Sequence, residues 1–331
     1  MMCPAPPPVP DIPFAAAINP LTRAVQEHSR DWVYRFGLVR GRAAVRRVTR
    51  MRLGYLAGRT HPRAPFDRLA VASDWLSWRF LLDGQVQELP PGLLTGPSAD
   101  APAASSGREL PDRMADVLRP GQPSADAPVS RALANLWRRT ARLASARWQE
   151  RFAADLSDHL RRLRAELVGT GPRQVPEVGA YVAARRHSSG LYVALDIVEL
   201  AEQVELPADV AASPEYRALR EATNDVVAWT GDIAAAARDI RRDSVHNLVI
   251  VLRYGRGCST EAALRYAAEM VRGRIEDFLE AERALPVAGS ALGHGAAIST
   301  GLRRVITGSE TWMRGHRDWV VDSQRRLRCP P

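Results

Sequence analysis

The chain has 331 residues, of which 46% are hydrophobic and 25% charged, a composition typical of a globular protein with one large or two small domains. All 46 basic residues are arginine, because the sequence contains no lysine. Enzymes that form a Schiff base on lysine and phosphate-binding loops that end in Gly-Lys are therefore excluded. The net charge of +9 does not indicate nucleic-acid binding, since the arginines lie among acidic residues rather than in one basic block.

The termini and the cysteines indicate where the protein resides. Cys3, Cys258 and Cys329 have no metal-binding spacing, so we expect a reducing compartment without disulfides. The first ten residues contain five prolines and no basic segment before an apolar run, unlike a signal peptide. No stretch reaches the roughly 18 uncharged apolar residues of a membrane helix. The sequence predicts a cytoplasmic protein with no membrane span and no nucleic-acid partner.

Apolar residues recur with helical spacing along most of the chain. This period predicts a helix over residues 67–82, a long helical run over 132–167 and another helix over 261–285. Proline and glycine clusters at 90–92, 169–176 and 286–295 mark connections between helices. No alternating runs flank an Asn-Gly or Asp-Gly pair, so no hairpin is expected. The predicted fold class is all-α.

The segment 92–128 differs in composition from the rest of the chain. It is rich in Pro, Ala, Ser and Asp, and Ser-Ala-Asp-Ala-Pro occurs in it twice. We interpret it as a flexible insertion with one short helix near 112–118. Residues 1–11 are predicted to be a disordered tail and 12–328 a single α-helical domain. The alternative is a domain boundary within the insertion.

Two carboxylates, Asp83 and Glu88, follow the aromatic helical run that contains Trp75, Trp78 and Phe80. Magnesium prefers carboxylate oxygens, and a substrate phosphate often completes its coordination. An acid at the end of a helix is, taken alone, more often a cap or a solvated residue. The neighbouring motifs decide between these interpretations.

Five blocks of sequence, in order, resemble bacterial class I terpene synthases. The run Asp-Trp-x-x-Trp-x-Phe-Leu-Leu-Asp ends at Asp83 and resembles the aspartate-rich motif, with Gly84 replacing its second Asp and Glu88 matching its last acid. The other blocks lie at 12–62, where an N-terminal strap precedes an element like Ala-Arg-Thr-Tyr-Pro, and at 181–190, 245–259 and 312–326. The resemblance covers about residues 12–326. It implies a single-domain helical bundle around an apolar cavity.

Two registers compete for the second metal motif, in which the family presents Asn, Ser and Glu at i, i+4 and i+8 on one helix face. One register is Asn224, Ala228 and Asp232, and the other is Gly231, Ala235 and Asp239. The second agrees with the family's spacing to His-Asn-Leu-Val, since 15 residues separate position 231 from position 246. In that register one ligand survives, Asp239, while Asp225 and Asp232 remain candidates for replacement carboxylates.

The resemblance implies a terpene cyclase that ionises a linear prenyl diphosphate, with farnesyl diphosphate as the default, and cyclises the carbocation. It implies Mg²⁺, of which the family binds three ions; the depleted motif predicts fewer here, held by Asp83, Glu88 and Asp239. It places a diphosphate sensor and a helix break at Arg185, Ser188 and Ser189. It assigns the diphosphate to Arg185, Arg238, Arg325 and Arg326, where Arg238 replaces a lysine and Arg326 a tyrosine. The candidates for the cavity wall are Trp75, Trp78, Phe80, Trp229, Trp312 and Trp319.

The depleted metal motif leaves two alternatives open. One is a diverged cyclase or isomerase that acts on a terpenoid without a diphosphate, using few metals or none. The other is a non-catalytic protein that binds an isoprenoid or a partner enzyme. A homodimer is common in the family, but the oligomeric state, the substrate chain length and the product skeleton do not follow from the sequence.

Overall fold

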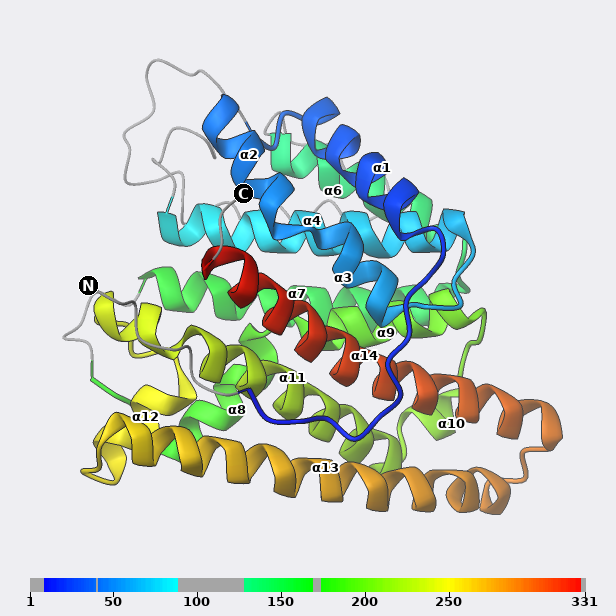
Figure 1. Cartoon of the computed structure of the whole chain (residues 1–331). Helices are drawn as coiled ribbons and strands as arrows, with labels where there is room; N and C mark the ends of the chain where they lie inside the picture. The colour runs from blue at the N-terminus through cyan, green and yellow to red at the C-terminus, as the bar shows by residue number, and fades with distance from the viewer. Residues whose placement is uncertain (1–8, 40, 89–127, 169–173, 329–331) are drawn as a thin grey trace.

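The computed structural model describes residues 9–39, 41–88, 128–168 and 174–328. In these residues helices are the only regular secondary structure, which confirms the predicted fold class (Figure 1). The helices, in chain order, are α1 (Thr22–Arg35), α2 (Arg42–Met51), α3 (Leu53–Thr60), α4 (Phe66–Glu88), α6 (Pro128–Ala141), α7 (Ala146–Val168), α8 (Val178–Ser188), α9 (Leu191–Glu202), α10 (Ala208–Ala211), α11 (Pro214–Arg241), α12 (Leu248–Gly255), α13 (Thr260–Ala291) and α14 (Ala296–Arg328).

Helices α4 and α13 confirm the predictions made for residues 67–82 and 261–285. Side-chain caps explain where three helices begin. Ser213 accepts a hydrogen bond from the Tyr216 amide at the start of α11, and Ser259 accepts one from the Ala262 amide at the start of α13. Asn247 caps α12 in the same way. These caps fix where α11, α12 and α13 begin.

The helical run predicted over 132–167 is two helices rather than one, because the chain breaks at residues 142–145 between α6 and α7. Ser145 starts the second helix by accepting a hydrogen bond from the Trp148 amide at 3.3 Å. The side-chain amide of Gln149 donates to the carbonyls of Ala141 and Ala144, each at 3.0 Å. These bonds satisfy carbonyls that a continuous helix would have used.

The connection predicted at 286–295 begins later than expected, since Pro286 lies inside α13 and the helix continues to Ala291. A proline removes one backbone hydrogen bond from a helix interior, at a cost of roughly 3 kcal/mol. Packing against α14 compensates, because Leu285 is fully buried and Gly289 lies against Leu302. A Cβ at position 289 would lie 2.9 Å from the Leu302 side chain, so the glycine permits this close approach.

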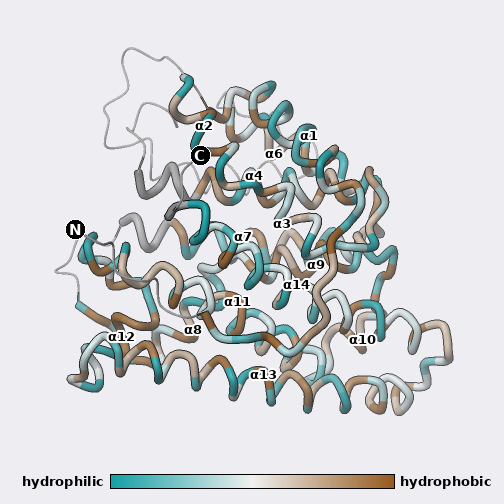
Figure 2. Tube along the Cα trace, in the orientation of Figure 1, coloured by the Kyte–Doolittle hydropathy of each residue, from teal (hydrophilic) through white to brown (hydrophobic). Residues whose placement is uncertain are grey.

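Two hydrophobic clusters form the interior. The larger includes residues of α3, α8, α9 and α11 to α14, and the smaller includes residues of α1, α4, α6, α7 and α9. Helix α9 contributes to both clusters, and α11 packs against α8, α9, α12, α13 and α14. Figure 2 shows hydrophilic and hydrophobic residues alternating along α13, as expected for a helix with one buried face. The interior between the two clusters is where a cavity is found.

The segment before α1 runs beside α13 and then crosses α14 on the outside of the bundle (Figure 1). Arg314 donates to the carbonyls of Ile12 and Phe14, both at 3.1 Å. Phe14 packs edge-on against Phe278 of α13, with ring centroids 5.5 Å apart. This is the segment that the sequence predicted to be an N-terminal strap.

Several predictions fall outside the described residues. These are the insertion at 92–128 with its short helix, except for residue 128, and the tail at 1–11, except for residues 9–11. Cys3 and Cys329 lie outside as well, while Cys258 is a free thiol. Within the described segments, every helix is too short or too polar to span a bilayer.

Candidate active site

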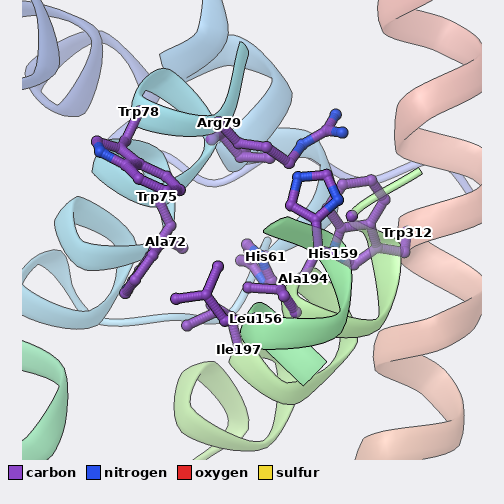
Figure 3. A pocket seen from close by; sticks show the side chains of 13 residues that line it. His61, Ala72, Trp75, Trp78, Arg79, Leu156, His159, Ala194, Ile197 and Trp312 are labelled. Carbon is purple, nitrogen blue, oxygen red and sulfur yellow. The ribbon is translucent and has the colours of Figure 1, made fainter. Parts of the chain in front are cut away.

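A pocket lies between the two hydrophobic clusters. Figure 3 shows Trp75 and Trp78 of α4 on one side of it and Trp312 of α14 on the other, with Arg79 also at the wall. Its remaining lining residues are mostly apolar: His61, Ala72, Leu76, Leu156, His159, Gly190, Val193, Ala194 and Ile197. Binding sites for small organic molecules are likewise lined mainly by apolar and aromatic side chains with a few polar groups.

The break between α8 and α9 borders the pocket. Gly190 has a φ of 66°, a left-handed conformation that favours glycine, and a Cβ there would lie 2.7 Å from Cδ of Arg79. Arg79 donates a hydrogen bond to the carbonyl of Ser189. The Ser189 hydroxyl donates to Oδ1 of Asn224 at 2.9 Å, and the Asn224 amide donates to the Arg186 carbonyl at 2.7 Å. The break is therefore held from both α4 and α11.

Arg185, the predicted diphosphate sensor, is partly buried on α8 and donates to Oδ1 of Asp232 at 2.9 Å. Oδ2 of Asp232 accepts hydrogen bonds from the Tyr181 hydroxyl and, at 3.1 Å, from the Leu248 amide. Asp232 itself is 3% exposed. Its carboxylate is thus engaged by donors from α8 and α12 and orients the guanidinium of Arg185. Ser188, the other residue predicted here, is the half-buried last residue of α8.

Asp225 lies two turns earlier on α11 and is equally engaged. Arg186 binds its carboxylate with Nε at 2.9 Å and Nη2 at 2.7 Å, and Arg274 of α13 approaches it at 2.9 Å. Arg186 also pairs with Glu221 at 2.7 Å. Burial raises the pKa of Asp225, while Arg186 and Arg274 oppose that rise. Asp225 and Asp232 therefore hold arginines rather than presenting free oxygens to a metal.

The α11 positions that match the family's triad do not fit a metal ion. Gly231 and Ala235 have no side-chain oxygen. Asp239 accepts a hydrogen bond from Nε of Arg238 at 2.8 Å and one from the Asn247 amide at 3.0 Å. Arg238 is itself mostly exposed, with 55% of its side chain accessible. Asp239 thus lies in an ion pair at the end of α11.

Across residues 9–39, 41–88, 128–168 and 174–328, no three His, Cys, Asp or Glu side chains gather in a metal-binding cluster. Asp83 and Glu88 lie in the last turns of α4, and their side chains are outside the described part of the chain. On α11, positions 231 and 235 carry no side-chain oxygen that could accompany Asp239.

The predicted arginines at the C-terminus lie near the end of α14. Arg325 is exposed, and Arg326 donates to the hydroxyl of Ser323 at 2.8 Å. Partial burial lowers the pKa of Arg326, and the neighbouring charges of Arg52 and Arg59 lower it further. Arg52 lies between α2 and α3 and Arg59 lies in α3, while Asp322 of α14, which pairs with Arg59 at 2.8 Å, opposes the shift.

Of the six aromatic candidates, three line the pocket: Trp75, Trp78 and Trp312. Trp75 and Trp78 are held by hydrogen bonds from their indole N–H groups to the Thr140 hydroxyl and the Val129 carbonyl. The other three do not line it. Phe80 and Trp319 pack edge-on against each other, with centroids 5.7 Å apart, and Trp229 is a buried core residue.

The sequence did not single out Arg79 or three histidines as site residues. His61 and His159 line the pocket, and His316 stacks on Trp312 with centroids 6.4 Å apart. Burial lowers the pKa of His61 to about 3, with Arg63 adding to the shift. One signal was available for His316, because it lies four residues after Trp312 and so on the same helix face.

Comparison with known proteins gives a consistent result. Residues 74–277 match a family model described as terpene synthase family 2, C-terminal metal binding. The chain is 30% identical to a (+)-T-muurolol synthase from Roseiflexus castenholzii, over 95% of this chain and 91% of that protein. It is 29% identical to a germacrene A synthase from Nostoc punctiforme, over 95% and 93%. The crystal structure of an α-eudesmol synthase superposes with a TM-score of 0.82 at 25% identity and covers 94% of this chain and 98% of that one.

Proposed function

Because the chain belongs to the terpene synthase family and is a terpene cyclase, we propose that it ionises farnesyl diphosphate and guides the resulting carbocation to a cyclic product. The observation that carries this proposal is the position of the helix break. Ser189 and Gly190 lie where an aromatic pocket meets the arginines of α4 and α8. The diphosphate of the substrate would thus meet the arginines, and its prenyl chain would meet the aromatic pocket, within one site.

The protein's own residues have separable tasks in this proposal. Arg79 and Arg185 bind and orient the diphosphate as its bond to the prenyl carbon breaks. The carbonyl end of α8 carries a partial negative charge, which favours a cation near the break. The faces of Trp75, Trp78 and Trp312 stabilise positive charge on the chain, and the apolar wall excludes water.

The choice of a C15 substrate is supported by two relatives. The synthases from Roseiflexus castenholzii and Streptomyces viridochromogenes are both named as cyclising (2E,6E)-farnesyl diphosphate. The pocket is lined mainly by apolar and aromatic side chains, which suits a prenyl chain. The product skeleton depends on the contour of the wall to within about a methyl group.

The matched family model describes a metal-binding domain. Since the α11 positions offer no second ligand, we propose that Mg²⁺ binding centres on Asp83 and Glu88 of α4 and involves fewer than three ions, with Asp239 a minor contributor. Arg238, Arg325 and Arg326 are proposed to meet the outer oxygens of the diphosphate. A cytoplasmic location and a homodimer also belong to the proposal.

The test is to incubate the purified protein with the C10, C15 and C20 prenyl diphosphates, each with Mg²⁺ and with EDTA, and to identify products by gas chromatography and mass spectrometry. We expect cyclic sesquiterpenes from the C15 substrate with Mg²⁺. Arg185→Met should reduce kcat/KM at least 100-fold, whereas Arg303→Met, at an exposed position of α14, should match the wild type. Unchanged or merely hydrolysed substrate in every reaction would contradict the proposal.

The metal-poor α11 side favours a second candidate, a cyclisation or isomerisation of a terpenoid without a diphosphate. Turnover of farnesol or a preformed sesquiterpene that persists in EDTA would support it, and full inhibition by EDTA would exclude it. A protein that binds these compounds and converts none of them would instead be a non-catalytic isoprenoid-binding protein.

A further inference from the structure

His316 of α14 faces the first position of the depleted triad on α11. A Cβ added to Gly231 would lie 3.7 Å from Cε1 of His316, so the imidazole lies against the glycine where a ligand side chain would start. Any longer side chain at 231 that extends toward α14 would meet the ring. Gly231, which lacks the ligand side chain, and His316 therefore face each other from α11 and α14.

The imidazole is fixed and buried. His316 is 8% exposed, it stacks on Trp312, and it lies against Trp319 with ring centroids 6.0 Å apart. Its Nδ1 atom is buried without a hydrogen-bond partner in the described part of the chain. An unpaired buried polar atom costs roughly 1 to 3 kcal/mol, so a ligand that supplies the partner would bind with that advantage.

The charged groups that act on His316 are arginines. Burial, together with the charges of Arg79 of α4 and Arg185 of α8, lowers the pKa of His316 to about 3. The group is therefore a neutral imidazole between an aromatic wall and two cations. Such a ring carries one N–H that can be donated, and the field of Arg79 and Arg185 favours an anion as the acceptor.

We propose that His316 is a diphosphate-binding residue, which donates a ring N–H to a phosphate oxygen beside Gly231 and acts with Arg79 and Arg185 where the triad has lost its metal ligands. This inference rests on the proposed function. It predicts a site that holds diphosphate through hydrogen bonds on its α11 side and depends on metal only on its α4 side.

The test is calorimetric titration of the full-length protein with inorganic pyrophosphate, in EDTA and in Mg²⁺. His316→Phe keeps an aromatic ring on Trp312 and removes both nitrogens, and we expect its affinity to fall about tenfold in both buffers. His316→Gln keeps an amide donor and should stay within about threefold of the wild type. The matched control is His294→Phe in the connection between α13 and α14, whose histidine pairs with Asp209, and its affinity should not change.

Equal pyrophosphate affinity of His316→Phe and the wild type would overturn the inference. Should that variant fail to fold, NMR spectra of the wild-type protein labelled with ¹⁵N-histidine provide a second test. The ring signal that is absent in His316→Gln must shift on addition of pyrophosphate, and an unshifted signal overturns the inference. Because these measurements need no turnover, a protein that binds pyrophosphate through His316 yet makes no terpene would contradict the proposed function alone.

Discussion

Replacing His316 by glutamine should make the stability of the protein less sensitive to acid. The native imidazole has a pKa of about 3, against an ordinary value of 6.5, chiefly because it is buried. Between these two values the unfolded chain binds a proton at this site and the native protein does not. Stability is therefore lost as the pH falls through 6.5, and the loss grows until the native group is protonated near pH 3.

The size of the effect follows from the two pKa values. Between pH 7 and pH 5 the unfolded chain gains about 0.7 proton at this residue and the native state gains almost none, which integrates to about 2 kcal/mol. The whole difference, reached near pH 3, is about 5 kcal/mol. Glutamine does not titrate, so the variant lacks this term whatever its stability at pH 7.

Urea unfolding of both proteins at pH 7 and pH 5, at constant ionic strength, measures the difference directly. The wild type should lose about 2 kcal/mol more than His316→Gln on acidification. The control is His246→Gln, an exposed position, which should follow the wild type at both pH values. Losses that agree within about 0.5 kcal/mol for the wild type and His316→Gln would refute the description of His316 as a buried neutral ring.

Three further predictions concern the core, the helix break and the triad. Phe152→Ala removes a fully buried ring that stacks on Trp148 and should cost roughly 3 to 5 kcal/mol in urea unfolding; a cost below about 1 kcal/mol would contradict that packing. Asn224→Ala removes an acceptor of the Ser189 hydroxyl and the amide donor to the Arg186 carbonyl, and it should lower kcat at least tenfold in product assays while KM changes less. An unchanged kcat would show that the break is held without Asn224. Restoring Asn, Ser and Glu at 231, 235 and 239 should raise Mg²⁺ affinity in titrations only when His316→Asn is added, because the imidazole lies against position 231. A gain in affinity from the three substitutions alone would show that His316 does not obstruct the site.

The sequence predicted the features that depend on local spacing. The apolar period located α4 and α13, and the order of five motifs identified the family and hence the bundle. It missed the break at 142–145, because a serine cap and one glutamine side chain outweigh a continuous apolar period there. It also extended the connection back to Pro286, because packing on α14 was not visible in the local sequence.

The site was less predictable because its members meet only through tertiary contacts. The spacing argument assigned Gly231 and Arg185 to their motifs, but it gave no sign that His316 faces Gly231 from a helix some 85 positions later in the chain. Arg79 reaches the carbonyl of Ser189 from α4, and no motif indicated that contact. Periodicity assigns a residue to a face of its own helix and does not say which helix covers that face.

For Arg185 to bind a diphosphate, its ion pair with Asp232 of α11 must open. If Arg185 turns toward a diphosphate, Asp232 loses its guanidinium partner while it remains buried. A buried carboxylate left without any donor would be costly, but Asp232 keeps the Tyr181 hydroxyl and the Leu248 amide, which come from α8 and α12. These two donors lower the cost of releasing Arg185, and the ring N–H of His316 then adds a donor to the same anion. Arg185 can thus exchange its ion pair with Asp232 for a contact with the diphosphate, although Gly231 and Ala235 supply no metal ligand on this side of the site.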